Sequence, residues 1–210
     1  MAISTYAQLQ TAVASWLNRS DLTTQIPDFI TLAESALNRR LNLRVMTQEA
    51  SLSTVASSRT VTLPTAFIEP LALWRLDTDR VPLIFRLPET MDISTTSGRP
   101  EYWAVDETIV FERPADAVYS LIFRYVKGFA LSDTDTTNWL LTNHPDVYLF
   151  ATLVEAAPYL RDDNLLAVWS ARFERAVGEV MEKESRSRSL ASLSTDLPVA
   201  RRGWDWLTGV

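Results

Sequence analysis

Reactive side chains are scarce in this chain of 210 residues. It contains no cysteine and a single histidine, His144. These counts exclude disulfides, thiolate zinc sites, cysteine nucleophiles and a multi-histidine metal site within one subunit. His144 stands immediately before Pro145, in a pattern typical of a helix start. We therefore expect Asn143 or His144 to cap a helix, and we assign His144 no catalytic role.

The acidic residues also lack the spacing that catalysis or metal binding needs. Asp162 and Asp163 are adjacent and point apart, whereas catalytic carboxylate pairs face each other about 5 to 9.5 Å apart. Residues 133–138 resemble the start of a calcium loop, but Asn138 replaces the required glycine and His144 the glutamate at the twelfth position. Five scattered glycines build no phosphate-binding loop. The sequence therefore predicts no catalytic residue, no cofactor and no metal site.

Two features are typical of protein interfaces instead. Trp204 and Trp206 lie two residues apart, with Arg201 and Arg202 nearby, and Trp and Arg dominate the binding energy of interfaces. We expect these four residues to dock on a partner protein. Glu155 is the one acidic residue in an apolar helical segment, where a buried carboxylate is costly unless it is paired. It reaches an exposed edge or an arginine of the same chain, or it contacts a neighbouring subunit.

The charge of the chain is unevenly distributed. A net charge of −6 argues against a free-standing DNA-binding protein, because such proteins need a basic face. Residues 185–210 carry +2, so the body before them carries −8, and we expect the two parts to have different roles. No signal peptide is recognisable, and the most apolar segment, 147–160, is shorter than the roughly 20 residues of a membrane span.

Hydrophobic spacing predicts helices at both ends of the chain. The first two helices, 4–17 and 26–41, are joined by a short connection that predicts an antiparallel hairpin. A third helix from Pro145 through Ala157 is apolar on almost every side, so other elements must cover it all round. A last helix, 166–180, has one apolar and one charged face. Its charged face is typical of exposure to solvent.

Between the helices, β-branched and aromatic residues alternate with turn residues, which predicts short strands. These strands are expected at 50–54, 60–63, 71–76, 83–87, 101–105, 108–111 and 119–126. Pro82 and Pro88 place their region at a sheet edge or in a connection. The sequence thus predicts an α+β chain. We expect an antiparallel helical bundle, made of an N-terminal hairpin and two C-terminal helices, from residues 1–45 and 138–185. An inserted antiparallel β domain is expected at 46–137, and an extended C-terminal arm at 186–210.

Three stretches together carry a family resemblance. They read STYAQLQTAVASWLNRSDLTTQIPDFITLAESALNRRL, SGRPEYWAVDETIVFERPADAVYSLIFRYV and ALSDTDTTNWLLTNHPDVYLFATLVEAAPYLRDD. In their order and spacing they resemble the head-to-tail adaptor proteins of tailed double-stranded DNA phages, relatives of podovirus tail tubular adaptors. The likeness covers about residues 4–185, so the arm that follows lies outside it.

The resemblance implies a structural role in the virion, at the head–tail interface of a particle assembled in the host cytoplasm. It implies a ring, usually of twelve copies, that sits beneath the portal protein, extends the DNA channel and carries tail or nozzle proteins. C-terminal segments of the family reach up to the portal, which is the role we expect for Arg201, Arg202, Trp204 and Trp206. Double-stranded DNA would pass through the ring without sequence-specific binding.

Three alternatives remain open from the sequence. The chain could form a tail tubular or tail-completion ring that does not touch the portal, and the two are distinguished by which of these partners it binds. It could be a small hydrolase, although no residue spacing predicts one. It could also bind DNA, in which case its affinity would fall steeply with salt.

Overall fold

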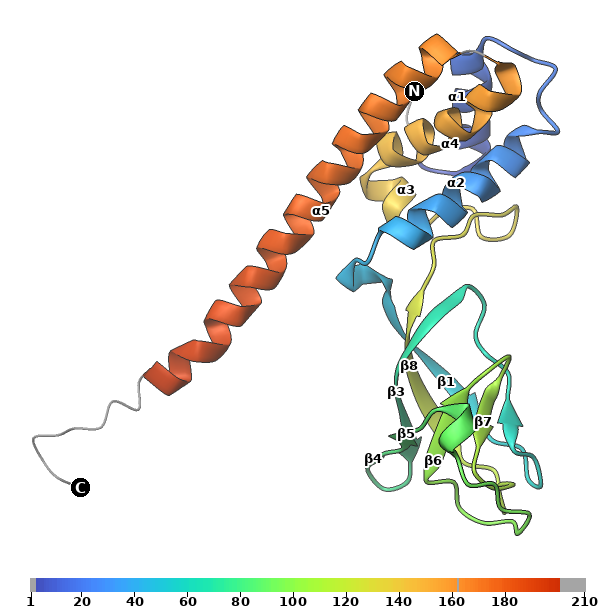
Figure 1. Cartoon of the computed structure of the whole chain (residues 1–210), viewed down its shortest axis with the longest axis vertical. Coiled ribbons are helices and arrows are strands. Elements are labelled where there is room, and N and C mark those ends of the chain that lie inside the picture. Colours follow the sequence, from blue (N-terminus) through green and yellow to red (C-terminus); the bar gives the residue numbers. More distant parts are fainter. Residues whose placement is uncertain (1–2, 162, 201–210) are drawn as a thin grey trace, which may run out of the picture. The chain divides into compact units, whose positions relative to one another are not determined.

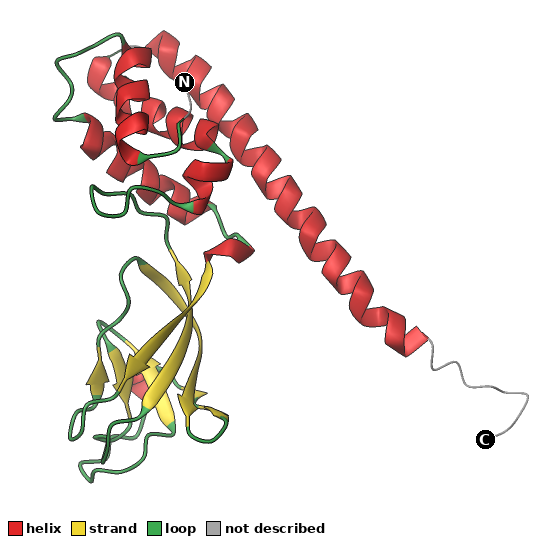
Figure 2. Cartoon of the chain, turned by 180° about the vertical axis from the view of Figure 1, so that it is seen from behind, coloured by secondary structure: helices red, strands yellow, loops and turns green. Residues whose placement is uncertain are grey.

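The computed structural model of the chain describes residues 3–161 and 163–200. It divides into two compact units. The helical unit comprises Met1–Arg44 with Leu131–Val210, and the β unit comprises Val45–Ala130. Figure 2 shows that all described strands lie in the β unit, whereas the α-helices lie in the helical unit.

The helical unit contains five α-helices within the described residues (Figure 1). They are α1 (Tyr6–Leu17), α2 (Ile26–Arg40), α3 (Trp139–Asn143), α4 (Pro145–Leu160) and α5 (Asp163–Ala200). Local sequence explains where they begin. The Thr5 side chain accepts from the Gln8 N–H and caps α1, while proline occupies the first turn of both α2 and α4.

Helix α4 is the centre of this unit. Its buried residues lie on several sides, as its almost uniformly apolar sequence requires. Helices α2 and α5 both pack chiefly on α4, and α1 contacts α4 more extensively than it contacts α2. Helix α5 packs a stripe that contains Trp169, Phe173 and Val177 against α4, and most of its other described side chains, up to residue 187, are exposed.

The β unit consists of two four-stranded sheets. The first has the order β1-β8-β3-β4 and is antiparallel throughout, and the second has the order β2-β7-β6-β5 with a parallel β5–β6 pair. The strands are β1 (Thr47–Ser53), β2 (Thr60–Val61), β3 (Phe67–Leu76), β4 (Arg80–Pro82), β5 (Ile84–Phe85), β6 (Tyr102–Val105), β7 (Ile109–Phe111) and β8 (Ser120–Lys127). Two short 3₁₀ helices, Arg44–Met46 and Pro88–Thr90, complete the described elements.

Aromatic residues form the core between the two sheets. Trp103 is fully buried, and its indole N–H donates to the Leu83 carbonyl at 3.2 Å. The ring of Phe123 meets Trp103 edge-on, with centroids 5.8 Å apart, and stacks on Tyr125 at 5.4 Å. Edge-on and offset-stacked pairs of this kind stabilise a core beyond the area that they bury. This core ties the short strands of the second sheet to the longer strands of the first.

The structure is α+β, but the architecture expected from the sequence is wrong in three respects. The described residues contain five α-helices, whereas the sequence predicted four, two in an N-terminal hairpin and two near the C-terminus. The additional helix is α3, formed by residues 139–143. Helices α1 and α2 pack mainly on α4 and not on each other, because α4 offers apolar surface on more sides. The β region is not one antiparallel insertion but two sheets, one of them mixed.

A fourth correction concerns the arm that was expected to be extended from residue 186. Helix α5 continues through these residues to Ala200. A helix that is already nucleated and packed over 163–184 adds further turns at little cost, because nucleation is its expensive step. The serine-rich composition of 185–194 is only mildly unfavourable in a helix.

Candidate functional site

The four residues expected to dock on a partner, Arg201, Arg202, Trp204 and Trp206, lie outside the described residues. The described chain leads directly to them, because α5 ends at Ala200. The structural question is therefore how α5 is attached to the helical unit and how far it runs beyond that attachment.

A charged contact fixes α5 to α2. The Arg40 guanidinium donates to both carboxylate oxygens of Glu174, at 2.6 and 2.7 Å, and lies 5.2 Å from the ring centroid of Phe173. We call this the α2–α5 clamp. Hydrogen bonding between the partners lowers the pKa of the Glu174 carboxyl and raises the pKa of Arg40. Farther along, the Arg44 N–H donates to Glu184 Oε1 at 3.0 Å, which attaches α5 at a second point.

Glu155, the predicted subunit-interface residue, lies half-buried on α4. Within residues 3–161 and 163–200 it takes part in none of the ion pairs. The arginine of the same chain that could have satisfied it is therefore not its partner in the described residues. A contact with another subunit stays a prediction.

His144 links α3 to α4 and occupies the N-cap position of α4, one of the two cap positions expected, but its side chain makes no capping hydrogen bond. No side-chain hydrogen bond caps α4, and the Asn143 amide donates instead to the Trp139 carbonyl. The His144 Nε2 atom is buried without a hydrogen-bond partner in the described part of the chain. Burial first, and then the positive charge of Lys183, lower the pKa of His144. The ring is thus a neutral packing group beside Trp139.

The helix cap of this region comes from Asn138, which joins a buried polar network. Its side-chain oxygen accepts from the Leu141 N–H at 2.9 Å, and its amide nitrogen donates to the Tyr148 hydroxyl at 2.6 Å. That hydroxyl donates to Glu34 Oε1 at 3.2 Å, and the Leu131 N–H also donates to this carboxyl. Burial raises the pKa of Glu34 to about 7. The network connects α2, α4 and the start of α3 through the Tyr148 hydroxyl.

Sequence reasoning missed Glu34, although a signal was present. Glu34 follows Ile30 by four residues and precedes Leu37 by three, so it falls on the apolar face that was recognised for this helix. Clusters of three or more His, Asp or Glu side chains able to hold a metal ion are absent from the described residues. The segment once compared with a calcium loop forms a turn in which the Ser132 N–H donates to the Asp135 carbonyl at 3.0 Å.

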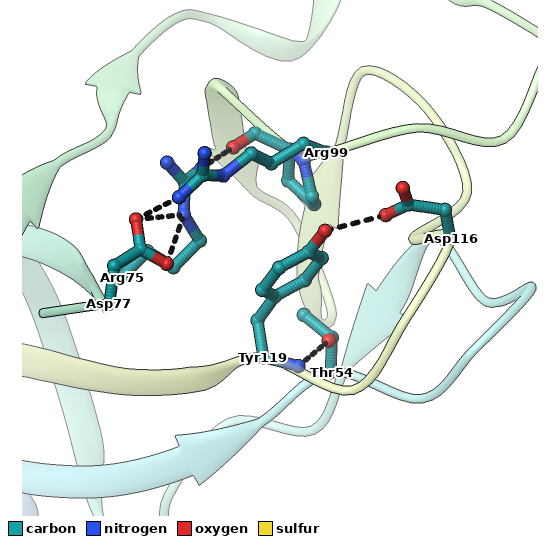
Figure 3. A network of polar contacts seen from close by, with 7 residues as sticks. Thr54, Arg75, Asp77, Arg99, Asp116 and Tyr119 are labelled. Carbon is teal, nitrogen blue, oxygen red and sulfur yellow. Dashed lines mark hydrogen bonds and ion pairs between the residues drawn. The ribbon is translucent and has the colours of Figure 1, made fainter.

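The β unit has its own polar network, at the end where β3 and the loop before β8 meet (Figure 3). Arg75 is 5% exposed and donates to the Asp77 carboxylate at 3.2 Å and to the Pro100 carbonyl at 2.5 Å. Its guanidinium lies 5.7 Å from the ring centroid of Tyr119, and Arg99 pairs with the same carboxylate from outside. A buried charge requires such complete pairing. The sequence signal was an arginine at an inward position of β3, two residues after buried Leu73.

We expect Asp77→Ala to lower the free energy of unfolding of the β unit by about 2 kcal/mol. Removing one partner of a buried pair costs roughly 3 to 5 kcal/mol, and this value is discounted because the Asp77 side chain is 25% exposed and Arg75 keeps Pro100. Urea unfolding measures the effect. Asp79→Ala removes the same charge from the same turn and serves as the control. Equal effects of the two substitutions would contradict the assignment.

Comparison with known proteins identifies the class to which the chain belongs. The family model described as SU10 adaptor protein matches residues 4–201, nearly the whole chain. The chain belongs to the SU10 adaptor protein family. This match confirms the resemblance to phage head-to-tail adaptors that the sequence indicated. Among curated proteins, none matches the chain.

Family membership makes the protein a structural phage adaptor, a component of the virion that associates with other phage head or tail proteins. In residues 3–161 and 163–200, no helix has the length and apolar character needed to cross a bilayer.

Proposed function

We propose that the chain is one subunit of a ring-shaped head-to-tail adaptor that docks on the portal, extends the DNA channel and presents a platform for tail or nozzle proteins. In this role it catalyses no reaction and binds no cofactor. Each ring contains about twelve copies, as the resemblance implies, and lies at the head–tail interface of the virion. Glu155 lies at the contact between neighbouring subunits.

One observation carries the docking proposal. The Arg44 N–H attaches α5 at Glu184, and the helix continues through residues 185–200. At 1.5 Å per residue, these 16 residues span about 24 Å. This length gives the helix enough reach to contact another protein.

The residues beyond α5 supply the docking chemistry. Arg201, Arg202, Trp204 and Trp206 follow within six residues of the end of the helix. Trp and Arg anchors in desolvated pockets typically contribute 2 kcal/mol or more each to an interface. Helix α5 therefore acts as a stalk. The α2–α5 clamp holds it to the helical unit, and its end places these docking residues at the portal.

Retention on immobilised portal protein, compared with retention on immobilised tail proteins, tests this function. The full-length chain should bind the portal in the absence of tail proteins. Binding to tail proteins alone would favour the alternative, a tail-completion ring that does not touch the portal. Binding to neither would contradict both versions of the adaptor role.

We expect double-stranded DNA to pass through the ring without binding to it. The body of the chain carries −8, and acidic residues at the lumen would repel the phosphates of the passing genome. Purified protein should show negligible affinity for duplex DNA at physiological salt. Tight binding that falls steeply as salt rises would contradict this expectation and favour a DNA-binding role.

A further inference from the structure

Two arginines of the β unit line a single pocket of about 310 Å³. Arg86 comes directly after β5, and Arg113 comes two residues after the end of β7. Tyr102 and the segment 91–94 also line the pocket. We call this site the Arg86–Arg113 pocket. Its volume lies at the lower end of the roughly 300 to 1,000 Å³ of protein ligand pockets, so it has room for a small group such as one side chain.

The Arg86 guanidinium is held in place without using its hydrogen-bond donors. It lies 4.1 Å from the ring centroid of Tyr102, and the Arg86 backbone N–H donates to the Trp103 carbonyl at 2.9 Å. Within residues 3–161 and 163–200, the Arg86 side chain makes no ion pair and no hydrogen bond. A guanidinium that stacks on an aromatic face keeps the N–H groups of its planar fork available for an anion.

Arg113 is fixed by a different set of contacts. Gly98 makes room for it, because a Cβ atom on Gly98 would lie only 3.0 Å from Arg113 Cδ. Arg113 Nε lies 3.2 Å from a carboxylate oxygen of Glu112, but it is buried without a hydrogen bond in the described part of the chain. That carboxylate already accepts from the Glu101 and Tyr102 N–H groups, at 3.0 and 3.1 Å. Arg113 therefore also keeps donors for a ligand.

The charges of the β unit favour a single carboxylate over a nucleic acid. Glu112 and Asp92 balance the two arginines, so the lining of the pocket is neutral. The unit as a whole has eight basic and eleven acidic residues, a net charge of −3, which opposes the binding of a polyanion. Met91 and Ile93 add apolar surface to the lining, which suits the methylene stem of an acidic side chain.

We propose that the Arg86–Arg113 pocket binds one carboxylate, supplied by an acidic side chain of another protein of the virion. The inference rests on association with other head or tail proteins, which family membership establishes, and not on portal docking by the C-terminal residues. Guanidinium forks bind carboxylates through paired N–H···O bonds, and arginine is enriched at protein interfaces. Tyr102 and Gly98 position the two arginines before the partner arrives, which reduces the entropy lost on binding.

Saturation-transfer NMR with the full-length chain tests the carboxylate assignment. The probe is the peptide Gly-Gly-Glu-Gly-Gly with an acetylated N-terminus and an amidated C-terminus, so that its only charge is one carboxylate. This peptide should bind at least tenfold more tightly than the same peptide with Gln in place of Glu, which lacks the charge but keeps the shape. Equal binding of the two peptides would overturn the proposal.

Two competitors separate the sources of the anion. Inorganic phosphate and acetate should each bind at least threefold more weakly than the Glu peptide. Phosphate carries more charge than the neutral lining balances, and acetate lacks the longer stem that contacts the apolar part of the lining. Tighter binding of phosphate would indicate a phosphate site, and equally tight binding of acetate would indicate a small carboxylic acid as the ligand. Either result would overturn the assignment to a protein side chain.

Arg86→Gln should weaken binding of the Glu peptide at least tenfold. It removes one guanidinium without breaking an ion pair of the described residues. Arg124→Gln removes the same charge from an exposed position of β8 and should leave the binding unchanged. Equal effects of the two substitutions would show that the peptide responds only to overall charge, which would overturn the proposal. If Arg86→Gln folds poorly, Arg86→Lys keeps the charge, loses the planar fork and should still weaken binding severalfold.

Discussion

Removal of residues 201–210 is expected to weaken binding to the portal about a thousandfold without changing the thermal stability of the subunit. Trp204 and Trp206 would each contribute about 2 kcal/mol as interface anchors, and about 4 kcal/mol corresponds to nearly three powers of ten in affinity. The contacts that hold α5 to its unit, at Glu174 and Glu184, lie before the deletion and remain intact. Portal binding by surface plasmon resonance and thermal unfolding measure the two quantities.

Single substitutions refine this prediction. Trp204→Ala and Trp206→Ala should each weaken portal binding about thirtyfold, whereas Trp16→Ala should not. Trp16 is a suitable control because it is 48% exposed but packs on Phe150 within the helical unit. Truncation after Glu184 removes the stalk as well and should also abolish binding. Wild-type affinity in any of these tail variants would disprove the docking role of the segment that the variant alters.

Glu34→Gln is expected to stabilise the helical unit progressively as the pH rises from about 4.5 to 7. Burial raises the pKa of Glu34 from 4.5 to about 7 in the folded state. As the pH rises, the Glu34 carboxyl therefore ionises first in the unfolded state and only later in the folded state. Its stabilisation of the folded state is fully present only below pH 4.5. The contribution is lost as the pH passes through 7. A shift of this size corresponds to about 3 kcal/mol of unfolding free energy.

Urea unfolding of the wild type and Glu34→Gln at pH 4.5, 6 and 8 measures this effect. The difference between the two proteins should change by about 3 kcal/mol in favour of the glutamine variant, because other titrating groups cancel in the comparison. Glu107→Gln removes one negative charge at an exposed turn and should give a difference that varies little with pH. A constant difference for Glu34→Gln would show that its carboxyl is not perturbed by burial.

The sequence was most informative where one local rule decided the outcome. Thr5 followed by Gln8 predicted the start of α1, and Pro145 predicted the start of α4. Pro82 indicated a sheet edge, and β4, which contains it, is the edge strand of its sheet. In each case a hydrogen-bond cap or a missing N–H fixes the backbone within a few residues, so no distant contact is needed.

Prediction failed where packing between distant segments decides. Which partner α1 and α2 choose depends on the apolar surface of α4, more than 100 residues away in the chain. The parallel pairing of β5 with β6 joins strands separated by a long loop, and nothing in either strand alone specifies its direction. The burial of Glu34 and Arg75 likewise depends on Tyr148, Asp77 and Tyr119, so their networks emerge only from the assembled units.

Electron microscopy of portal particles mixed with the full-length chain tests the central claim most directly. The account predicts a closed ring of added density beneath each portal, with a helical projection from each subunit that reaches the portal. Portal particles without added density, together with a chain that remains monomeric at every concentration, would contradict it.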